Sequence, residues 1–436
     1  MNVGIISLGC AKNKVDTEEV LSYLARNDFH IVSDCTIADI LIVNTCGFIE
    51  SAKQEAIDTI FDTLQYGKIT VVIGCLVERY YEDLKKLIPE VDLFVPIRDY
   101  GRFGELLGEV LEKKHIENNL HGKLELTKRV YSTPSYQAYL QISDGCNNCC
   151  TYCAIPLIRG HFRSYPIEEL KVTLDDLDKR GIQEVVVISQ DTTRYGSDLV
   201  GQNVNICTLL KEVLKYENFK FVRLLYLYPD EITDELIDLF RDNPRLTPYF
   251  DVPIQHSEDH ILKDMHRRGS KADLVMLFNK IRTKVPHAVL RTTLIVGFPG
   301  ETEEDVENLD QFIRDVKFDH LGVFTYSREE DTVSYNYDNQ IPEDVKKERY
   351  NKIMKTQAGI SFGLNQKRIG QVIDVLITGY NEDEYCYEGA CYLYAPDDID
   401  GTLYIYSQDE LEIGKMYKAK IVNADSYDMD VEVISE

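Results

Sequence analysis

The sequence predicts a multidomain α/β protein. We expect an N-terminal parallel α/β domain, a central partial or full barrel of repeated strand–helix units, and a small C-terminal all-β barrel. Three observations predict this fold: the 436 residues suffice for two to four domains, short β-branched runs alternate with helical patterns, and the chain ends in alternating apolar and polar residues. The expected domains are residues 1–115, 136–365 and 366–436, with a linker at 116–135.

The composition argues against several classes of function. Lys and Arg number 48 against 74 Asp and Glu, and the net charge is −26. Such a charge disfavours binding to nucleic acid as the main partner and to an anionic membrane, and favours a basic partner. The sequence contains no run of about 18 apolar residues, which is the length needed to span a bilayer. The 11 Cys are clustered and odd in number, which indicates metal or redox chemistry in a cytoplasmic protein with reduced thiols.

Residues 1–115 alternate between strand and helix patterns. The expected strands are Val3–Ser7, Ile40–Asn44 and Thr70–Gly74. The expected helices are Asp16–Arg26, Ser51–Leu64 and Glu78–Ile88. This alternation predicts a parallel sheet with crossover helices. A loop containing glycine and cysteine follows each strand, with Cys10, Cys46 and Cys75. Because ligands bind at the carboxyl ends of such strands, we expect the three thiols to meet at one edge.

The alternation resumes in residues 136–365. The expected strands are Tyr139–Ile142, Glu184–Ser189, Phe219–Leu225, Tyr249–Val252, Leu290–Val296 and His320–Thr325. Helical patterns separate them, among them Ile167–Arg180, Asp259–Arg267 and Glu303–Val316, and a long helix over Pro342–Gln366 closes the domain. About six such units predict a full or partial barrel with its active site at the C-terminal ends of the strands.

The last part, residues 366–436, predicts a small all-β module with turns at Asn381, Pro396–Asp398 and Asp400–Gly401. It holds 5 Lys and Arg against 16 Asp and Glu, a net charge of −11, together with nine Tyr. An RNA-binding module is expected to be basic and to stack bases on aromatic rings. The acidic module therefore favours a basic protein as partner, while the alternative reading of the charge is general solubility.

The strongest chemical signal is a C-x3-C-x2-C motif formed by Cys146, Cys150 and Cys153. Iron–sulfur clusters are held by Cys thiolates, and four thiolates complete a [4Fe–4S] cube. Three thiolates leave one iron open for a substrate or cofactor. The alternative is a zinc site with Cys149 as its fourth ligand, but adjacent Cys149 and Cys150 make poor tetrahedral geometry.

This motif follows the first strand of the predicted barrel and has an aromatic residue before its last cysteine. In these respects it resembles the radical S-adenosylmethionine (SAM) superfamily. The resemblance implies that Cys146, Cys150 and Cys153 hold a [4Fe–4S] cluster whose open iron binds SAM. It also implies that SAM is cleaved to a radical that abstracts hydrogen from an unactivated carbon, while the protein positions that carbon.

The same resemblance implies SAM contacts at the ends of other strands. The expected residues are Tyr152, Ile155, Gln190, Gln255, Gly297 and Phe298. Taken alone, Gly297 is also explained by turn chemistry. Arg194, Arg223 and His256 are candidates near the barrel mouth, without an assigned role.

The N-terminal cysteines identify a narrower family. The segments around Cys10, Cys46 and Cys75 resemble the N-terminal domain of the methylthiotransferases, in which three Cys bind a second [4Fe–4S] cluster. The C-terminal module matches that family's TRAM domain in position and size, so the resemblance covers nearly the whole chain. It implies that the second cluster carries sulfur, that SAM supplies a methyl group, and that a C–S–CH3 thioether forms. The alternative is that the three Cys are buried structural residues.

Two classes of methylthiotransferase compete, one acting on a tRNA adenosine and one on an aspartate of ribosomal protein "S twelve". Residues 7–16, SLGCAKNKVD, resemble the SLGC-x-KN-x-VD of the ribosomal-protein class, whereas the tRNA enzymes read more like GCQMN. Residues 326–332, YSREEDT, resemble YS-x-EEGT rather than YSPRPGT, with Asp331 in place of the usual glycine. Together with the acidic C-terminal module, these motifs favour the ribosomal-protein class.

We therefore expect an enzyme that adds a methylthio group to the β-carbon of an aspartate in "S twelve", using two [4Fe–4S] clusters and SAM. Its expected partners are this basic protein, free or in the ribosome, a sulfur donor and a small electron-transfer protein. The alternatives are a tRNA adenosine methylthiotransferase and a non-enzymatic zinc scaffold or iron–sulfur sensor.

Overall fold

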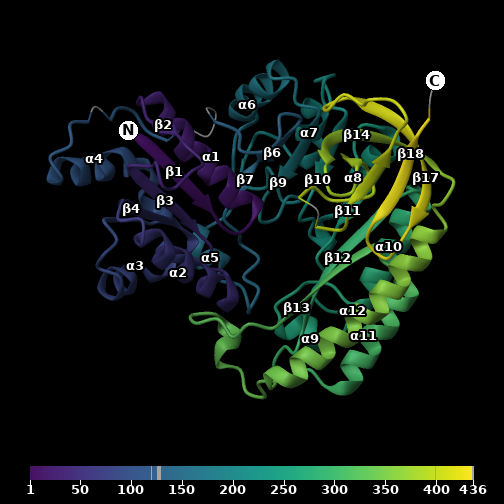
Figure 1. Cartoon of the computed structure of the whole chain (residues 1–436). Helices are drawn as coiled ribbons and strands as arrows, with labels where there is room; N and C mark the ends of the chain where they lie inside the picture. Colours follow the sequence, from purple (N-terminus) through teal and green to yellow (C-terminus); the bar gives the residue numbers. More distant parts are fainter. Residues whose placement is uncertain (119, 125–128, 398, 435–436) are drawn as a thin grey trace.

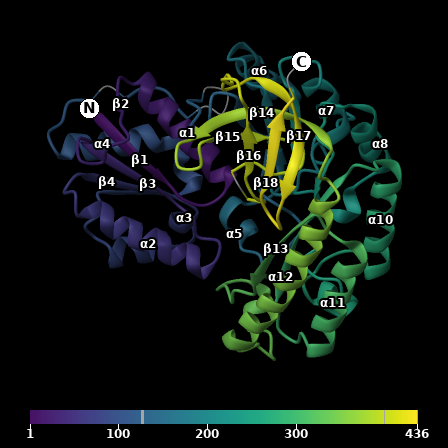
Figure 2. The ribbon, with the colours of Figure 1, turned by 45° about the vertical axis from the view of Figure 1, so that its right-hand side comes forward.

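The computed structural model describes residues 1–436 with the exception of 119, 125–128, 398 and 435–436. Asp398 of the predicted turn and part of the predicted linker therefore lie outside the described residues. The N-terminal domain lies on the left in both views, and helix α12 (Glu343–Gln366) runs from the lower part of the central domain toward the C-terminal barrel (Figures 1 and 2). The predicted three-part α/β fold is confirmed, with a parallel sheet, a central strand–helix domain and a closed β-barrel.

The N-terminal domain is a parallel five-stranded sheet in the order β2-β1-β3-β4-β5. Its strands are β1 (Asn2–Ser7), β2 (His30–Ile31), β3 (Ile40–Thr45), β4 (Ile69–Gly74) and β5 (Leu93–Val95). Its helices are α1 (Ala11–Arg26), α2 (Glu50–Leu64), α3 (Cys75–Leu87) and α4 (Phe103–Lys113), with η1 (Ile97–Arg102) before α4. Every residue of β3 and β4 is buried, as expected for central strands covered on both faces.

Two helices of this domain begin earlier than the sequence predicts. Helix α1 begins at Ala11 instead of Asp16, and α3 begins at Cys75 instead of Glu78. Cys75 is thus the first residue of a helix and not part of a loop. The residues that precede these helices, Cys10 and Gly74, make no side-chain capping hydrogen bond, so the usual start signal is missing.

Six parallel strands form the central domain: β6 (Gln137–Gln141), β9 (Glu184–Ile188), β10 (Phe221–Leu224), β11 (Tyr249–Asp251), β12 (Val289–Val296) and β13 (His320–Thr325). They pair as β10-β9-β6 and β11-β12-β13, and a bridge between Val222 and Leu246 joins the two groups. Among the described residues β6 and β13 are not paired, so the barrel is partial. A small antiparallel pair, β7 (Ser143–Asp144) and β8 (Arg163–Ser164), flanks the cysteine motif.

Helices cover the outside of this partial barrel (Figure 2). They are α6 (Ile167–Lys179), α7 (Ile206–Val213), α8 (Asp234–Asp242), α10 (Lys271–Lys284) and α11 (Glu303–Val316), whereas α5 (Ile155–Arg159) packs against α3, and the short α9 (Asp259–Asp264), η2 (Pro229–Glu231) and η3 (Val333–Asn336) lie in the connections. The helix predicted over Asp259–Arg267 ends at Asp264, and the strand predicted over Phe219–Leu225 is confined to Phe221–Leu224. The apolar faces of these helices and strands form one continuous core.

The C-terminal part is a closed barrel in the order β14-β15-β16-β18-β17. Its strands are β14 (Val372–Asn381), β15 (Cys386–Ala390), β16 (Leu403–Tyr406), β17 (Met416–Ala424) and β18 (Met429–Val433). Its core is continuous with the interior of the central barrel, where Leu393 belongs to the same cluster as Val186 and Tyr249. No helix in the described ranges has the length and apolar character needed to cross a membrane.

Candidate active site

One cavity of about 330 Å³ contains all six cysteines that the sequence singles out. It lies where the loops after β1 and β3 and the start of α3, directly after β4, face the central domain. Its walls are Cys10, Lys12, Cys46, Phe48, Cys75, Cys146, Asn148, Cys150, Tyr152, Cys153, Ile155, Ile158, Arg159, Gln190, Tyr226, Leu227, Tyr228, Pro253, Gln255 and Arg267. The predicted meeting of three N-terminal thiols is therefore observed, and a second set of three faces it.

Glycines allow the three N-terminal loops to approach one another closely. Gly9 has a φ of 88°, and a Cβ atom at this position would lie 2.9 Å from the Cβ of Cys46. A Cβ at Gly47 would lie 2.6 Å from the Cα of Leu76, the residue after Cys75. A larger residue at either position would force two of the loops apart, because glycine is the residue that tolerates such close approach.

In the central set, backbone amides point at two of the sulfurs. The Asn148 amide donates to Cys146 Sγ at 3.5 Å, and the Ile155 amide donates to Cys153 Sγ at 3.4 Å. Hydrogen bonds of this kind tune the potential of thiolate-bound clusters. Cys149 is exposed and is not part of the cavity wall.

The two sets do not resemble a site for a single metal ion. Within the described residues, no three Cys, His, Asp or Glu side chains converge closely enough to hold one ion. A zinc ion would need its sulfur ligands at about 2.3 Å, whereas an iron–sulfur cube is larger than one ion and its ligands stand farther apart. Three soft thiol donors on each side of one cavity fit the ligand set of such a cube.

Burial raises the pKa of four of these thiols, so they stay protonated at neutral pH until a metal replaces the proton. It raises the pKa of Cys75 to about 12, and the charge of Arg159 lowers this pKa only in part. Burial also raises the pKa of Cys46, Cys146 and Cys153. Cluster binding at this cavity must therefore release protons, as is general for thiolate sites.

Three cations line the cavity, and the sequence assigns a role to none of them. Arg159 reaches from α5 to the N-terminal domain, where its guanidinium binds Asp16 at 2.6 Å and approaches Cys75 Sγ at 3.8 Å. Arg267 lies over the ring of Tyr228, with its Cζ 4.0 Å from the centroid. Lys12, the third, belongs to the SLGCAKNKVD segment, which indicates the family but no role for the lysine, whereas Arg159 and Arg267 belong to no motif.

Four of the six predicted SAM contacts line the cavity, namely Tyr152, Ile155, Gln190 and Gln255. Gln190 donates through Nε2 to Asp144 at 3.2 Å, while its buried Oε1 has no hydrogen-bond partner. Gln255 has a φ of 71° and pairs with Leu294 of β12 through an isolated bridge. Gln190 therefore presents an unused buried acceptor in the cavity that the central cysteines line.

Gly297 and Phe298 do not line the cavity. The Gly297 amide donates to Glu301 Oε2 at 2.6 Å. Phe298 is fully buried behind Tyr152 and makes an edge contact with Tyr326, at a centroid separation of 5.4 Å. A direct contact of either residue with SAM stays a prediction.

The three candidates near the barrel mouth are also absent from the cavity wall, and each is engaged elsewhere. Arg223 is fully buried and pairs with Glu184 at 3.1 Å. Arg194 pairs with Glu231 at 2.9 Å, and His256 contacts Glu301 at 3.1 Å. These residues were candidates only because they lie near strand ends in the sequence. In the structure each one pairs with a glutamate outside the cavity wall.

A second cavity of about 230 Å³ shares Phe48, Tyr152 and Gln255 with the first. Its remaining wall is largely apolar and comes from Ile49, Thr293, Ile295, Phe324, Thr325, Tyr326, Ser327 and Glu329. Phe324 is 52% exposed, although it is a large apolar residue. The cysteine cavity therefore continues between the N-terminal domain and the ends of β12 and β13.

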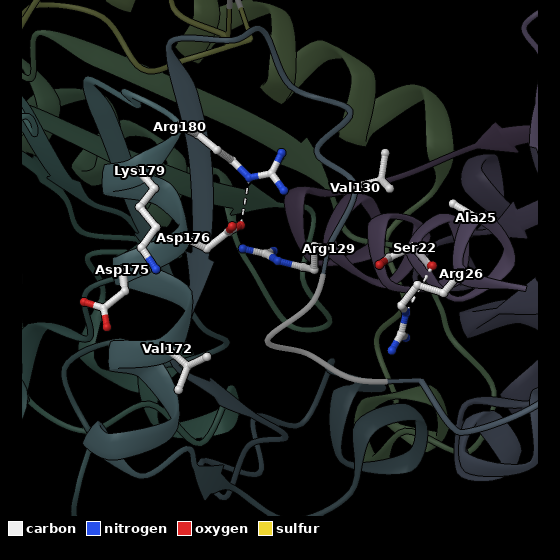
Figure 3. A pocket seen from close by; sticks show the side chains of 10 residues that line it. All are labelled: Ser22, Ala25, Arg26, Arg129, Val130, Val172, Asp175, Asp176, Lys179 and Arg180. Atoms are coloured by element: carbon white, nitrogen blue, oxygen red, sulfur yellow. Dashed lines mark hydrogen bonds and ion pairs between the residues drawn. The ribbon is translucent and has the colours of Figure 1, made fainter.

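A third cavity, of about 530 Å³, lies apart from the cysteines between α1 and α6 (Figure 3). Its three arginines have partners: Arg180 donates to Asp176 at 2.8 Å, and Arg129 donates to the carbonyl of Tyr139 at 2.7 Å. Arg26 donates to the carbonyl of Ser22 within its own helix. This cleft is a polar seam between the N-terminal and central domains.

Comparison with known proteins supports each of the three parts. Residues 2–96 match the uncharacterised protein family UPF0004, residues 140–313 match the radical SAM superfamily, and residues 369–434 match the TRAM domain. A solved radical SAM methyltransferase, TsrM from Kitasatospora setae, has a similar fold, with a TM-score of 0.53 at 13% identity over 74% of each chain.

Curated relatives match the chain along its whole length. The "Ribosomal protein uS12 methylthiotransferase RimO" of Clostridium botulinum is 43% identical over 98% of this chain and 97% of its own. Proteins of the same name from Trichlorobacter lovleyi and Clostridioides difficile are each 44% identical, cover 100% of this chain, and are themselves covered over 98% and 99% of their lengths.

Proposed function

This chain belongs to the RimO family of ribosomal protein uS12 methylthiotransferases, and from this premise we propose that it attaches a methylthio group to the β-carbon of an aspartate in ribosomal protein uS12. The reaction is that of a radical SAM enzyme with two [4Fe–4S] clusters. The observation that carries the proposal is the single cavity in which two sets of three thiols face each other.

Cys10, Cys46 and Cys75 are the proposed ligands of one cluster, and Cys146, Cys150 and Cys153 are those of the other. Each set supplies one thiolate fewer than a cube can bind, which leaves one iron open for a further ligand. When bound, the central cluster would supply the electron that cleaves SAM, and the N-terminal cluster would hold the sulfur to be transferred.

The protein itself binds SAM, orients the reacting carbon of the substrate and excludes water from the cavity. Tyr152, Ile155, Gln190 and Gln255 stand beside the central cysteines and are the proposed SAM contacts. Gly297 and Phe298 would support these contacts from behind the cavity wall, where Phe298 packs against Tyr152. The walls that close the cavity would keep water and other hydrogen donors from the reacting carbon, which is the usual contribution of a protein to cofactor-based radical chemistry.

The remaining partners follow from the chemistry. The substrate is a basic ribosomal protein, which a chain of net charge −26 would attract. Each turnover consumes sulfur and an electron, so a sulfur donor and a small reductant such as an electron-transfer protein are required. We place the reaction in the cytoplasm, free or on the ribosome.

The test is mass spectrometry of uS12 after anaerobic incubation with the reconstituted enzyme, SAM, sulfide and a reductant. We expect a gain of about 46 Da on one aspartate, abolished in Cys146→Ala and in Cys10→Ala because each change removes an iron ligand. Cys149→Ala is the matched control, since Cys149 lies outside the cavity wall, and it should retain the modification.

The other outcomes discriminate between the alternatives. Cleavage of SAM without modification of uS12 would refute the substrate, and tRNA would be tried next. Zinc in place of about eight irons per chain would refute both clusters. Two intact clusters without SAM cleavage would favour a sensor over an enzyme.

A further inference from the structure

Lys12 is a buried cation in the cysteine cavity without a carboxylate partner. It lies in the first turn of α1, two residues after Cys10, and only 7% of its surface is exposed. Its ammonium group lies 3.7 Å from the centroid of the Tyr226 ring. No Asp or Glu side chain of the described residues lies within ion-pair distance of it. A cation–π contact is weaker than the ion pair that a buried ammonium normally needs.

Other buried cations of this chain have such a partner. Short ion pairs join Arg159 to Asp16, Arg223 to Glu184, Arg349 to Glu301 and Arg129 to Glu18. The carboxylates that could serve Lys12 are already engaged, since Asp251 pairs with Arg291 at 3.0 Å and Asp144 lies 3.6 Å from Arg159. Burying a charge without a partner is costly, so this position is built for an anion that arrives from outside the chain.

The other cation of the cavity that lacks a carboxylate is Arg267. Its guanidinium, however, donates to the carbonyl of Pro253 and stacks on Tyr228 beside Cys150 of the central set. Lys12 lies instead on the N-terminal side, next to Cys10, where the sulfur for transfer would be held. Arg267 therefore lies at the end of the cavity with the central cysteines, and Lys12 lies at the end with the N-terminal cysteines.

We propose that Lys12 binds the side-chain carboxylate of the target aspartate and makes the cavity select an acidic residue. This inference rests on the proposed function and names the residue that recognises its substrate. An ion pair to the carboxylate fixes the carbon next to it, which is the β-carbon that reacts. The pair forms away from bulk water, where a charge-assisted contact is strong.

The test measures binding of uS12 and of uS12 with its target aspartate changed to asparagine. The enzyme carries both clusters and SAM but receives no reductant, and iron and sulfide contents are matched between variants. We expect the wild-type enzyme to bind the aspartate form at least about tenfold more tightly, since one lost charged contact is worth this much or more. Lys12→Met should bind both forms about equally, and Lys12→Arg should keep a preference.

The matched control is Lys14→Met. Lys14 lies two residues further on, pairs with Asp397 at 3.0 Å and does not line the cavity, so this variant should keep the full preference. A wild-type enzyme without preference, or a Lys12→Met variant that keeps it, overturns the inference. Failure of the wild-type enzyme to modify the aspartate form once reductant is added refutes the proposed function instead.

Discussion

At the scale of single residues, the contact between the N-terminal and central domains is made of buried charge. Arg159 of α5 is 2% exposed, binds Asp16 at 2.6 Å and donates to the side-chain oxygen of Asn13 at 3.0 Å. Both partners belong to α1, directly after Cys10. One guanidinium therefore ties the helix that follows the first N-terminal cysteine to the helix that follows the central motif.

Removing Arg159 is expected to destabilise the protein strongly. Arg159→Ala leaves Asp16 buried without its cation, which typically costs about 3–5 kcal/mol. Urea unfolding followed by circular dichroism should show this loss. Arg102→Ala is the control, because Arg102 and Glu105 form an exposed pair, and exposed pairs contribute little to stability. Equal effects of the two variants would contradict the structural role of Arg159.

Glu19 makes the stability of the same interface depend on pH. Burial raises the pKa of this carboxyl from 4.5 to about 8, Asp16 adds to the effect, and Oε1 has no hydrogen-bond partner. The folded chain therefore keeps a proton that the unfolded chain loses above about pH 4.5. Because the folded state binds more protons, stability falls as the pH rises from about 4.5 to about 8.

Glu19→Gln should remove this dependence. We expect the variant to exceed the wild type in unfolding free energy by on the order of 2 kcal/mol near pH 7.5, with a difference that shrinks toward pH 5. Urea unfolding at a series of pH values measures it. Glu348→Gln, at an exposed position of α12, should follow the wild-type curve. A Glu19→Gln advantage that grows at low pH would contradict the assigned direction.

At the scale of elements, the loop after β13 clasps the N-terminal domain. Glu329 is 2% exposed and accepts from Arg79 at 2.9 Å and from Ser327 at 2.6 Å, while the ammonium of Lys53 lies 3.2 Å away. Arg79 also donates to the carbonyl of Gly47, next to Cys46. The YSREEDT motif, which favoured the ribosomal-protein class on sequence alone, thus holds the loop of an N-terminal cysteine.

Glu329→Ala should loosen this clasp. The change leaves Arg79 and Lys53 without their shared carboxylate, a loss of about 3 kcal/mol or more that should raise amide exchange in residues 326–333 by about 100-fold. Hydrogen exchange with mass spectrometry would detect it. Glu330→Ala removes only an exposed acceptor of the Tyr80 hydroxyl and should have a much smaller effect. Unchanged exchange in Glu329→Ala would exclude the clasp.

The sequence predicted the features that depend on the order of strands and helices along the chain. It did not predict the features that depend on contacts between the domains. The positions of Cys10, Cys46 and Cys75 follow from the rule that loops after parallel strands share one edge, and this rule needs no tertiary information. The start of α1 was placed too late because Lys12 and Asn13 are polar yet buried. Lys12 is covered by Tyr226 of the central domain and Asn13 by the segments around Thr45 and Cys75, and no local hydrophobic pattern records such contacts.

At the scale of the whole molecule, the C-terminal barrel is fixed to the central one. The loop before β16 carries Asp400, which is 6% exposed, accepts from the hydroxyl of Tyr249 and pairs with Arg291 at 3.1 Å. Arg223 of β10 donates to the carbonyl of Cys391, and His320 of β13 contacts the carbonyl of Leu393 at 2.8 Å. These contacts fill the interior of the partial barrel.

This docking has a consequence for substrate access. A C-terminal module that is held by buried ionic contacts does not swing freely to deliver a substrate to the cavity. The β pattern of residues 366–436 predicted the module itself. Its position against the central barrel depends on Arg291 and Tyr249, which are far away in sequence. The apolar cavity beside Phe324 is then the route by which a substrate side chain would reach the cysteines.

Asp400→Ala should release the C-terminal barrel. The change leaves the Tyr249 hydroxyl without its acceptor and Arg291 with only Asp251, a loss of about 3 kcal/mol. We expect faster tryptic cleavage near Lys367 and Arg368, where the chain enters the barrel, because this loop supplies the buried carboxylate among the contacts that hold the barrel on the central domain. Asp374→Ala, which breaks an exposed pair with Lys418, should leave cleavage unchanged. Cleavage of Asp400→Ala at the wild-type rate would show that the apolar contacts of Leu393 and its neighbours hold the barrel without the ion pair, and that the buried charge serves orientation instead of attachment.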